Sequence, residues 1–311
     1  MRKSLFYLAL IAALFAASCK KDHNQGGPKN QSPKKYAVNF SVSGNFTQSI
    51  TGNAVVHGRN LAILPSEAAI FYYYVYDTAG NLVHKIIQTP ATTTNYGNIQ
   101  DSLANGTYSV IFAAGMAGLR TSLNTGDDEA GINYAVLTYD NQTSEGYLID
   151  TAWKDAFFKK LSLTVSSGNV TQSVTLSRIV SKIEVEVLDA LPTNAKTLEI
   201  TYDQDYSQFS FATAQSQSPY TFVSTTTIPA ADLSKTGFSV SNIIGNTIAP
   251  MTVTIKCYNS SSAVIAQRTV SNVSCQANKA TVLSGDLFST NSSFQVSLDT
   301  TFNPTPIVIH Y

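Results

Sequence analysis

The sequence predicts an all-β protein whose folded part consists of two tandem β-sandwich domains. Apolar and polar residues alternate with period two in segments such as Tyr36–Val42 and Ile183–Val187, which is the pattern of half-buried strands. Ser, Thr, Asn and Gly separate these segments at short intervals, as in the turns of sandwiches. About 275 residues follow the N-terminal region, a length that suits two sandwiches better than one. We expect the first domain over residues 36–170 and the second over residues 171–311.

The chain begins with the layout of a secretory signal. Arg2 and Lys3 precede an unbroken apolar run of thirteen residues, Leu5–Ala17. As a helix this run would rise about 20 Å, which is too short to cross a hydrocarbon core about 30 Å thick. Residues 1–18 are therefore predicted to be a signal peptide that is removed from the mature protein.

Cys19 directly follows the predicted cleavage point. The stretch Ala16-Ala17-Ser18-Cys19 resembles the bacterial lipobox, in which the cysteine is acylated and becomes the first mature residue, although Ala16 stands where leucine is usual. The alternative is an ordinary cleavage site beside a chance cysteine. Because the chain has only three cysteines and this one lies at the cut, we favour lipidation of Cys19. Several acyl chains would hold the protein on a membrane, where one chain alone binds marginally.

Residues 19–35 are predicted to form a flexible tether. They contain two glycines, two prolines and almost no apolar side chain, so they cannot bury enough surface to offset the entropy of ordering. The first 35 residues also hold seven of the twenty Lys and Arg but one of the twenty Asp and Glu. The remaining chain has thirteen positive and nineteen negative groups, a net charge of about −6. Nucleic acid, which needs clustered basic side chains, is therefore not an expected partner.

The first domain contains the aromatic run Phe71–Tyr76. On a strand, alternate residues of this run face opposite sides of the sheet. One interpretation is an exposed row of tyrosines that stacks on sugar rings. The other is a strand buried on both faces, with phenolic hydroxyls reaching the rim, and we favour this second interpretation.

An internal repeat supports two related domains. Phe71–Lys85 and Val253–Gln267 align at a constant offset of 182, and each reads as a strand, a Tyr-Asp or Tyr-Asn pair, a turn of small residues and a second strand. Between the two hairpins, Thr151–Phe158 is the one segment with a pattern that suits a short helix.

The second domain holds the other two cysteines and the C-terminal tail. Cys257 and Cys275 could form one disulfide in an exported protein or remain two buried free thiols. Pro306–Tyr311 reads as a short strand. It could be the last strand of the second domain, or it could add to the open sheet edge of a partner.

No arrangement of residues in the sequence indicates an enzyme. The four histidines show no G-x-S-x-G, H-E-x-x-H or C-x-x-C context, and we interpret them as surface or strand residues; they are His23, His57, His84 and His310. The acidic groups at 126–129 and Asp203–Asp205 do not fit the EF-hand spacing and are expected to be solvated loops. The sequence therefore predicts no catalytic residue, no metal site and no cofactor.

Four short triplets resemble the Asp-Ser/Thr-apolar acceptor of periplasmic O-glycosylation in Bacteroidetes. Composition alone would give roughly one such triplet. The candidate acceptor hydroxyls are those of Thr78, Ser102, Thr151 and Thr300.

Several motifs together resemble the fimbrillin-associated anchor and tip lipoproteins of type V pili in Bacteroidetes. The four segments are the Tyr-Asp-x-x-Gly hairpin at Ile70–Val83, the Leu…Gly-x-Tyr-x-Val strand entry at Leu103–Val110, the Leu-x-Arg-x-Val-x-Lys-Ile strand at Val174–Ile183 and the Asn-x-x-Thr-x-Leu-x-Gly strand at Asn278–Leu287. The resemblance implies two transthyretin-like β-sandwich domains, a lipid anchor in the outer membrane and fimbrial subunits as partners. Stalk subunits of such pili are processed near the start of the first domain. Arg178 lies instead at the boundary between the domains, which argues against a stalk subunit.

We therefore expect a non-enzymatic, lipid-anchored outer-membrane protein at the cell surface that serves as a fimbrial anchor or as an accessory or tip subunit in cell adhesion. The alternative is a surface glycan-binding lipoprotein associated with polysaccharide uptake. Exposed coplanar aromatic side chains would favour glycan binding, whereas an open sheet edge would favour assembly with other subunits.

Overall fold

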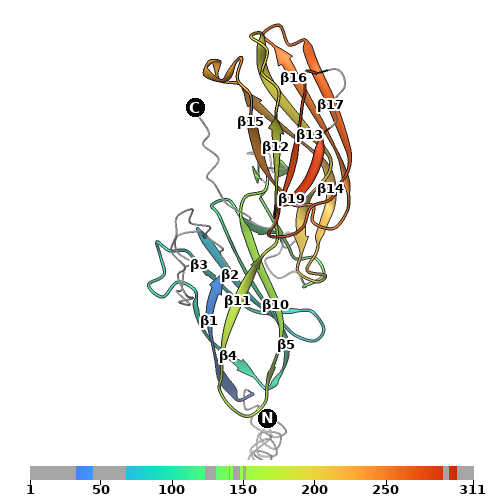
Figure 1. The fold of residues 1–311 in the computed structure, drawn as a ribbon. Helices are drawn as coiled ribbons and strands as arrows, with labels where there is room; N and C mark the ends of the chain where they lie inside the picture. The colour runs from blue at the N-terminus through green and yellow to red at the C-terminus, as the bar shows by residue number, and fades with distance from the viewer. Residues whose placement is uncertain are drawn as a thin grey trace, which may run out of the picture. The chain divides into compact units, whose positions relative to one another are not determined.

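A computed structural model describes residues 33–44, 68–122, 131–139, 141–142, 148–149, 152–289 and 294–299 (Figure 1). Within these ranges the chain is β almost throughout, with no α-helix and one 3-10 turn, Ala230–Asp232. The all-β prediction is confirmed. No helix among the described residues is long and apolar enough to span a bilayer.

The first seven-stranded sheet has the strand order β3-β2-β5-β10-β11-β1-β4. The bounds of its strands are β1 Lys35–Gly44, β2 Ile70–Tyr76, β3 Leu82–Gln88, β4 Asn98–Ala104, β5 Gly106–Gly115, β10 Ala156–Val165 and β11 Val170–Arg178. Most of β11 runs parallel to β1, while its last two residues pair with β10. The sheet folds over at β11, so that β1 and β4 face β2, β5 and β10 across a hydrophobic core.

The second group of strands forms two more sheets. One has the order β15-β12-β18-β19 and the other the order β17-β16-β13-β7-β6, with β14 also paired to β13. The bounds are β6 Arg120–Ser122, β7 Val136–Thr138, β12 Ser181–Val187, β13 Ala195–Ser210, β14 Ser216–Thr227, β15 Phe238–Ile244, β16 Met251–Asn259, β17 Val264–Val273, β18 Ala280–Gly285 and β19 Gln295–Asp299. The short strands β8 Asn141–Gln142 and β9 Leu148–Ile149 pair with each other. A second hydrophobic core lies between the β12 and β13 sheets.

Strand β2 is buried on both faces, as the favoured interpretation of its aromatic run predicts. Phe71, Tyr73 and Val75 belong to the core of the seven-stranded sheet. The alternate residues Tyr72, Tyr74 and Tyr76 belong to a third cluster, which also contains Phe209 and Phe211 from β13 and the turn after it. All six residues from Phe71 to Tyr76 are at most 5% exposed. The interpretation of an exposed tyrosine row is therefore wrong.

The third cluster connects the two groups of sheets. Residues 208–210 at the end of β13 pair with β7, so a strand from before residue 170 joins a sheet of the second group. Lys35–Tyr311 accordingly forms one compact unit. The seven-stranded sheet ends at Arg178 and the next sheet begins at Ser181. The division into two domains near residue 170 stays a prediction.

The two hairpins of the sequence repeat have the same turn. In the first hairpin, Asp77 Oδ1 accepts hydrogen bonds from the backbone N–H groups of Ala79 and Asn81 at 2.9 and 2.8 Å. In the second, Asn259 Oδ1 accepts from Ser261 and Ala263, each at 3.0 Å. These positions match at the predicted offset of 182. The side-chain acceptor holds the turn in both cases, and this explains why Asp and Asn are interchangeable there.

The helix expected over Thr151–Phe158 is wrong. Residues 156–165 form β10, and residues 152–155 have no regular structure. Phe157 packs into the core of the seven-stranded sheet, while Ala156 and Phe158 pack into the third cluster on the opposite face. Successive residues can bury their side chains on opposite sides only in an extended strand, so packing overrides a weak helical pattern.

The first testable prediction uses the two ends of the tyrosine row. Tyr72 Oη donates to Leu119 O at 2.9 Å, whereas Tyr76 Oη is buried without a hydrogen-bond partner among the described residues. Tyr72→Phe leaves a buried carbonyl unpaired and should lower the free energy of unfolding by about 1 kcal/mol. Tyr76→Phe removes an unpaired hydroxyl and should be neutral or stabilising. Urea unfolding of both variants measures this, and equal losses would contradict the assignment of partners.

Candidate functional site

Several predicted sites lie outside the described residues. They are the signal peptide at 1–18, the lipidation site Cys19, almost all of the tether, the acceptors Thr151 and Thr300, the tail Pro306–Tyr311, the acidic group at 126–129, and His23, His57 and His310. These stay predictions.

Cys257 and Cys275 are free thiols in the structure, one of the two alternatives that the sequence leaves open. Cys257 lies on β16 and faces the second core, and Cys275 follows β17 in the same core. Burial raises the pKa of each thiol to about 11. A thiol with this pKa stays protonated at neutral pH and is a poor nucleophile, so neither cysteine is suited to catalysis.

Thr78 and Ser102, the two described candidates for O-glycosylation, are both exposed. Thr78 lies in the turn between β2 and β3, and Ser102 lies on the edge strand β4. The aspartate of each triplet is held locally: Asp77 by the hairpin turn, and Asp101 by the Ser102 backbone N–H at 2.6 Å. The bonds from Asn81 are the main cause that lowers the pKa of Asp77. Their glycosylation stays a prediction.

A polar cluster joins the two edge strands of the seven-stranded sheet. His84 Nδ1 on β3 lies 2.7 Å from Asp101 Oδ1 on β4, and Tyr73 Oη donates to Asp101 Oδ2 at 3.0 Å. The Asp101 side chain is 2% exposed and that of His84 is 49% exposed. Gln88 adds a second link, since its side chain donates to Asn98 O and accepts from Gly97 N, each at 2.9 Å. Sequence reasoning placed His84 in a strand but missed its carboxylate partner seventeen residues away.

This polar cluster links the edge strands β3 and β4, and it lacks the arrangement of a catalytic dyad. A hydrolase would need a hydroxyl or thiol nucleophile beside the histidine. The buried Tyr73 hydroxyl contacts Asp101, and burial raises the pKa of Tyr73 well above its usual value. The described residues also contain no group of three or more His, Cys, Asp or Glu that could hold a metal.

Arg178 forms a buried ion pair where the chain leaves β11. Its Nε and Nη2 donate to the two oxygens of Asp155 at 2.5 and 2.7 Å, and its Nη1 donates to Asn278 Oδ1 at 2.6 Å. The guanidinium also lies 5.0 Å from the centre of the Phe157 ring. Its side chain is 1% exposed, so Arg178 is inaccessible to a protease in the folded chain.

The acidic group Asp203–Asp205 is not the solvated loop that the sequence predicts. Both aspartates lie on β13, at a break in its pairing with β14. Asp203 Oδ1 accepts from Thr252 N at 2.7 Å, and Asp205 Oδ1 accepts from Asn246 N at 2.8 Å. Asp205 is fully buried, and its Oδ2 has no hydrogen-bond partner among the described residues. Burial raises the pKa of Asp205 to about 6.

Strand β19 is an exposed edge strand. It ends the β15-β12-β18-β19 sheet, and all five of its residues are exposed. Val296 lies opposite the core residue Leu283 of β18, so Val296 and Leu298 point to the apolar side of the sheet. They nevertheless remain 47% and 45% exposed. An edge strand with free apolar side chains is a surface on which a partner can bind.

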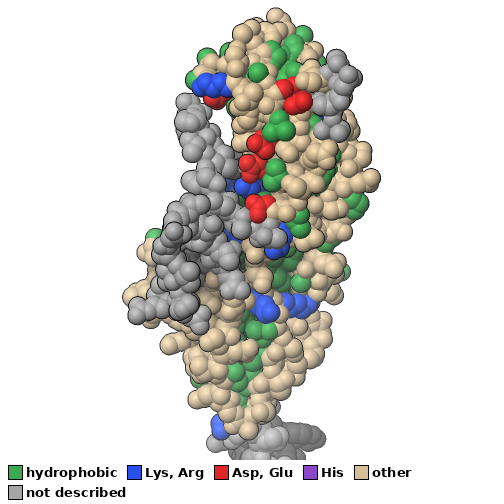
Figure 2. All heavy atoms as spheres, in the orientation of Figure 1, with side chains coloured by type: hydrophobic (Ala, Val, Ile, Leu, Met, Phe, Trp, Pro, Cys, Tyr) green, Lys and Arg blue, Asp and Glu red, His purple; other side chains and the backbone are tan. Residues whose placement is uncertain are grey.

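The other side of this sheet carries charged side chains of β12, where Lys182 pairs with Glu184 at 3.0 Å. Glu184 and Glu186 on β12 alternate with the core residues Ile183, Val185 and Val187. Figure 2 shows acidic side chains interleaved with hydrophobic ones on the upper half of the visible face. This distribution fits the negative net charge that the sequence predicts for the folded part.

The second testable prediction concerns Asp205. Its folded pKa of about 6 lies above the unfolded value of 3.8, so its contribution to stability is complete below pH 3.8 and is lost as the pH rises through 6. Relative to Asp205→Asn, the free energy of unfolding of the natural protein should fall by about 1 kcal/mol between pH 5 and pH 7.5. Urea unfolding of both proteins at both pH values measures this difference. Parallel pH profiles would show that Asp205 does not titrate in this range.

Solved structures of similar fold come from Bacteroidetes. A candidate polysaccharide-binding protein from Bacteroides thetaiotaomicron has a TM-score of 0.54 and 9% identity over 84% of this chain and 97% of its own. A candidate adhesin from the same organism has a TM-score of 0.53 and 11% identity over 86% and 97%. The fimbrial anchor protein Mfa2 from Porphyromonas gingivalis has a TM-score of 0.51 and 10% identity over 85% and 97%. The fold-level resemblance to fimbrial anchor proteins is therefore confirmed.

Sequence comparison gives the family. No curated protein sequence matches the chain significantly. A family model described as a family of unknown function (DUF6562) matches residues 69–307, which is more than half of the chain. The protein therefore belongs to the family DUF6562.

Proposed function

We propose that this protein is a non-enzymatic accessory subunit of a fimbrium, anchored in the outer membrane by a lipid on Cys19. The exposed edge strand β19 is the observation that carries the proposal. The position of β19 at the end of its sheet, with half-exposed Val296 and Leu298, suits the addition of a strand from another subunit. The fold shared with a fimbrial anchor protein supports it, as does the signal-and-cysteine layout of the N-terminus.

The buried polar groups support a structural role over a catalytic one. The pKa values of Cys257 and Cys275 are raised, the Arg178–Asp155 pair is enclosed, and the Asp101 carboxylate is occupied by Tyr73 and His84. The Arg178–Asp155 pair and the Asp101 contacts join separate segments, and the two thiols are buried in the second core.

Glycan binding is the second candidate function. The tyrosine row Tyr72, Tyr74 and Tyr76 is buried and cannot stack on a sugar ring. A different observation favours it, a small surface pocket beside Phe238.

The third testable prediction concerns the anchor. Cys19→Ala removes the thioether-forming side chain and should shift the protein from the membrane fraction to the soluble fraction, because a tether alone binds no bilayer. Intact-mass measurement of the natural protein should show cleavage before Cys19 and added acyl mass. A natural protein without acyl mass would contradict lipidation, as would an alanine variant that has lost its signal peptide by intact mass and still stays on the membrane.

The fourth testable prediction concerns the β19 edge. The double substitution Val296→Lys and Leu298→Lys places charge on an exposed apolar edge and should lower the recovery of fimbrial subunits in a pull-down from native outer membrane at least tenfold. Val264→Lys on β17 is the matched control, since Val264 is 50% exposed on another edge strand. Thermal unfolding should show that both variants fold.

Recovery of a polysaccharide-uptake complex in place of fimbrial subunits by the natural protein would contradict the fimbrial proposal. Unchanged recovery of fimbrial subunits by the β19 variant would contradict the β19 edge as the binding surface.

A further inference from the structure

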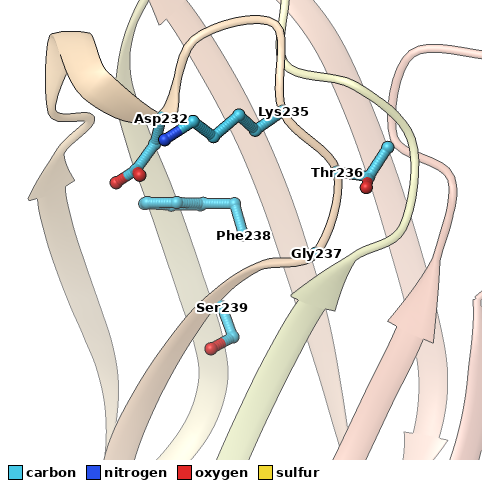
Figure 3. A pocket seen from close by; sticks show the side chains of 6 residues that line it. All are labelled: Asp232, Lys235, Thr236, Gly237, Phe238 and Ser239. Atoms are coloured by element: carbon cyan, nitrogen blue, oxygen red, sulfur yellow. The ribbon is translucent and has the colours of Figure 1, made fainter.

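A surface pocket of about 270 Å³ lies where the chain enters β15 (Figure 3). The residues that line it are Asp232, Lys235, Thr236, Gly237, Phe238 and Ser239. They belong to the connection between β14 and β15, which contains the 3-10 turn Ala230–Asp232. The connection is far in sequence from the β19 edge and from the N-terminal cysteine.

The backbone of this connection is fixed by the buried core. Ser234 N donates to Leu191 O at 2.8 Å, and Leu191 N donates back to Lys235 O at 3.0 Å. Gly237 N donates to Val187 O at 3.0 Å. Leu191 and Val187 are at most 1% exposed. The pocket is therefore preformed, which lowers the entropic cost of binding a ligand.

The polar side chains of the pocket are available to a ligand. Among the described residues, none of the side-chain polar atoms of Asp232, Lys235, Thr236 and Ser239 makes a hydrogen bond within the chain. Gly237 adopts a φ of +77°, and no atom lies within 4 Å of the position that a Cβ would take. A larger residue at this position would be strained and would fill part of the open space.

An aromatic ring lies beside these polar groups. Phe238 is half-buried and packs partly against the second core, opposite Val187 in the sheet register. Figure 3 shows the Asp232 and Lys235 side chains on the same side of the Phe238 ring plane. The pocket thus combines a flat apolar surface with one carboxylate acceptor and one ammonium donor.

This combination selects the class of ligand. The face of an aromatic ring is electron-rich and attracts the partly positive C–H groups on the flat face of a pyranose. Vicinal hydroxyls can donate to the Asp232 carboxylate and accept from the Lys235 ammonium. Asp232 disfavours an anion and Lys235 disfavours a cation. A volume of about 270 Å³, below the usual range of about 300–1,000 Å³ for ligand pockets, is enough for one sugar ring.

We infer that the pocket at Asp232–Ser239 binds a single neutral pyranose unit. Phe238 stacks on the sugar ring, and Asp232 and Lys235 hold its hydroxyls. A ligand of this size in a shallow pocket binds with a Kd of about 1 mM. The site acts independently of the lipid anchor and of the β19 edge.

The test uses the mature chain and four probes: methyl α-mannoside, methyl α-glucoside, methyl β-galactoside and glucuronic acid. Saturation-transfer NMR and titration should show at least one neutral glycoside binding with a Kd of about 1 mM, and glucuronic acid binding at least tenfold more weakly. Phe238→Ala should abolish binding. Asp232→Ala and Lys235→Ala should each weaken it about tenfold without changing thermal stability, since these side chains have no partner among the described residues.

The matched control is Tyr134→Ala. Tyr134 is the most exposed large hydrophobic residue of the described chain, at 62%, and lies outside the pocket, so its removal should leave binding unchanged. Binding of none of the neutral glycosides, unchanged binding in the Asp232 and Lys235 variants, or loss of binding in the Tyr134 variant would each overturn the inference. Recovery of fimbrial subunits by the Asp232 variant in the pull-down separates failure of this site from failure of the fimbrial proposal.

Discussion

Burial of strand β2 on both faces is the constraint on which the described fold depends. Phe71, Tyr73 and Val75 fill the core of the seven-stranded sheet, while Tyr72, Tyr74 and Tyr76 fill the cluster against the end of β13. An aromatic side chain buries about 150–250 Å², so this strand contributes to both clusters at once. Two of the buried phenols also make hydrogen bonds, and the contacts of Tyr73 with Asp101 and of Tyr72 with Leu119 fix neighbouring segments.

Buried polar contacts also join the two groups of sheets. The Arg178 guanidinium connects Asp155, just before β10, with Asn278, just before β18. Removing one partner of such a buried pair typically costs about 3–5 kcal/mol, because the other charge is left without compensation. The Trp153 indole donates to the Tyr206 carbonyl in the same part of the molecule. The two groups of sheets are therefore joined by directional bonds as well as by apolar packing.

Features that can serve recognition lie at the edges and in the connections of this framework. The β19 strand, the hairpin turn with Thr78 and the pocket beside Phe238 are all exposed or open, whereas Cys257, Cys275 and Asp205, whose pKa values are raised, are buried. A rigid β framework can carry different binding surfaces without a change in its core. Similar folds among adhesin-like and fimbrial proteins at about 10% identity fit this view.

The sequence by itself determined the features that depend on near neighbours. Period-two alternation gave the all-β class, the run Phe71–Tyr76 indicated a strand buried on both faces, and the Asp77 and Asn259 side chains specified two equivalent turns. Only the tertiary structure decided features that depend on distant segments. Phe157 and Phe158 lie on a strand because their side chains pack into different hydrophobic clusters on its two faces. Asp205 is buried by distant segments, and His84 on β3 contacts Asp101 on β4 between the two edge strands of the sheet. Local patterns fix the conformation of a segment, but the topology that brings strands together decides which side chains are desolvated and paired.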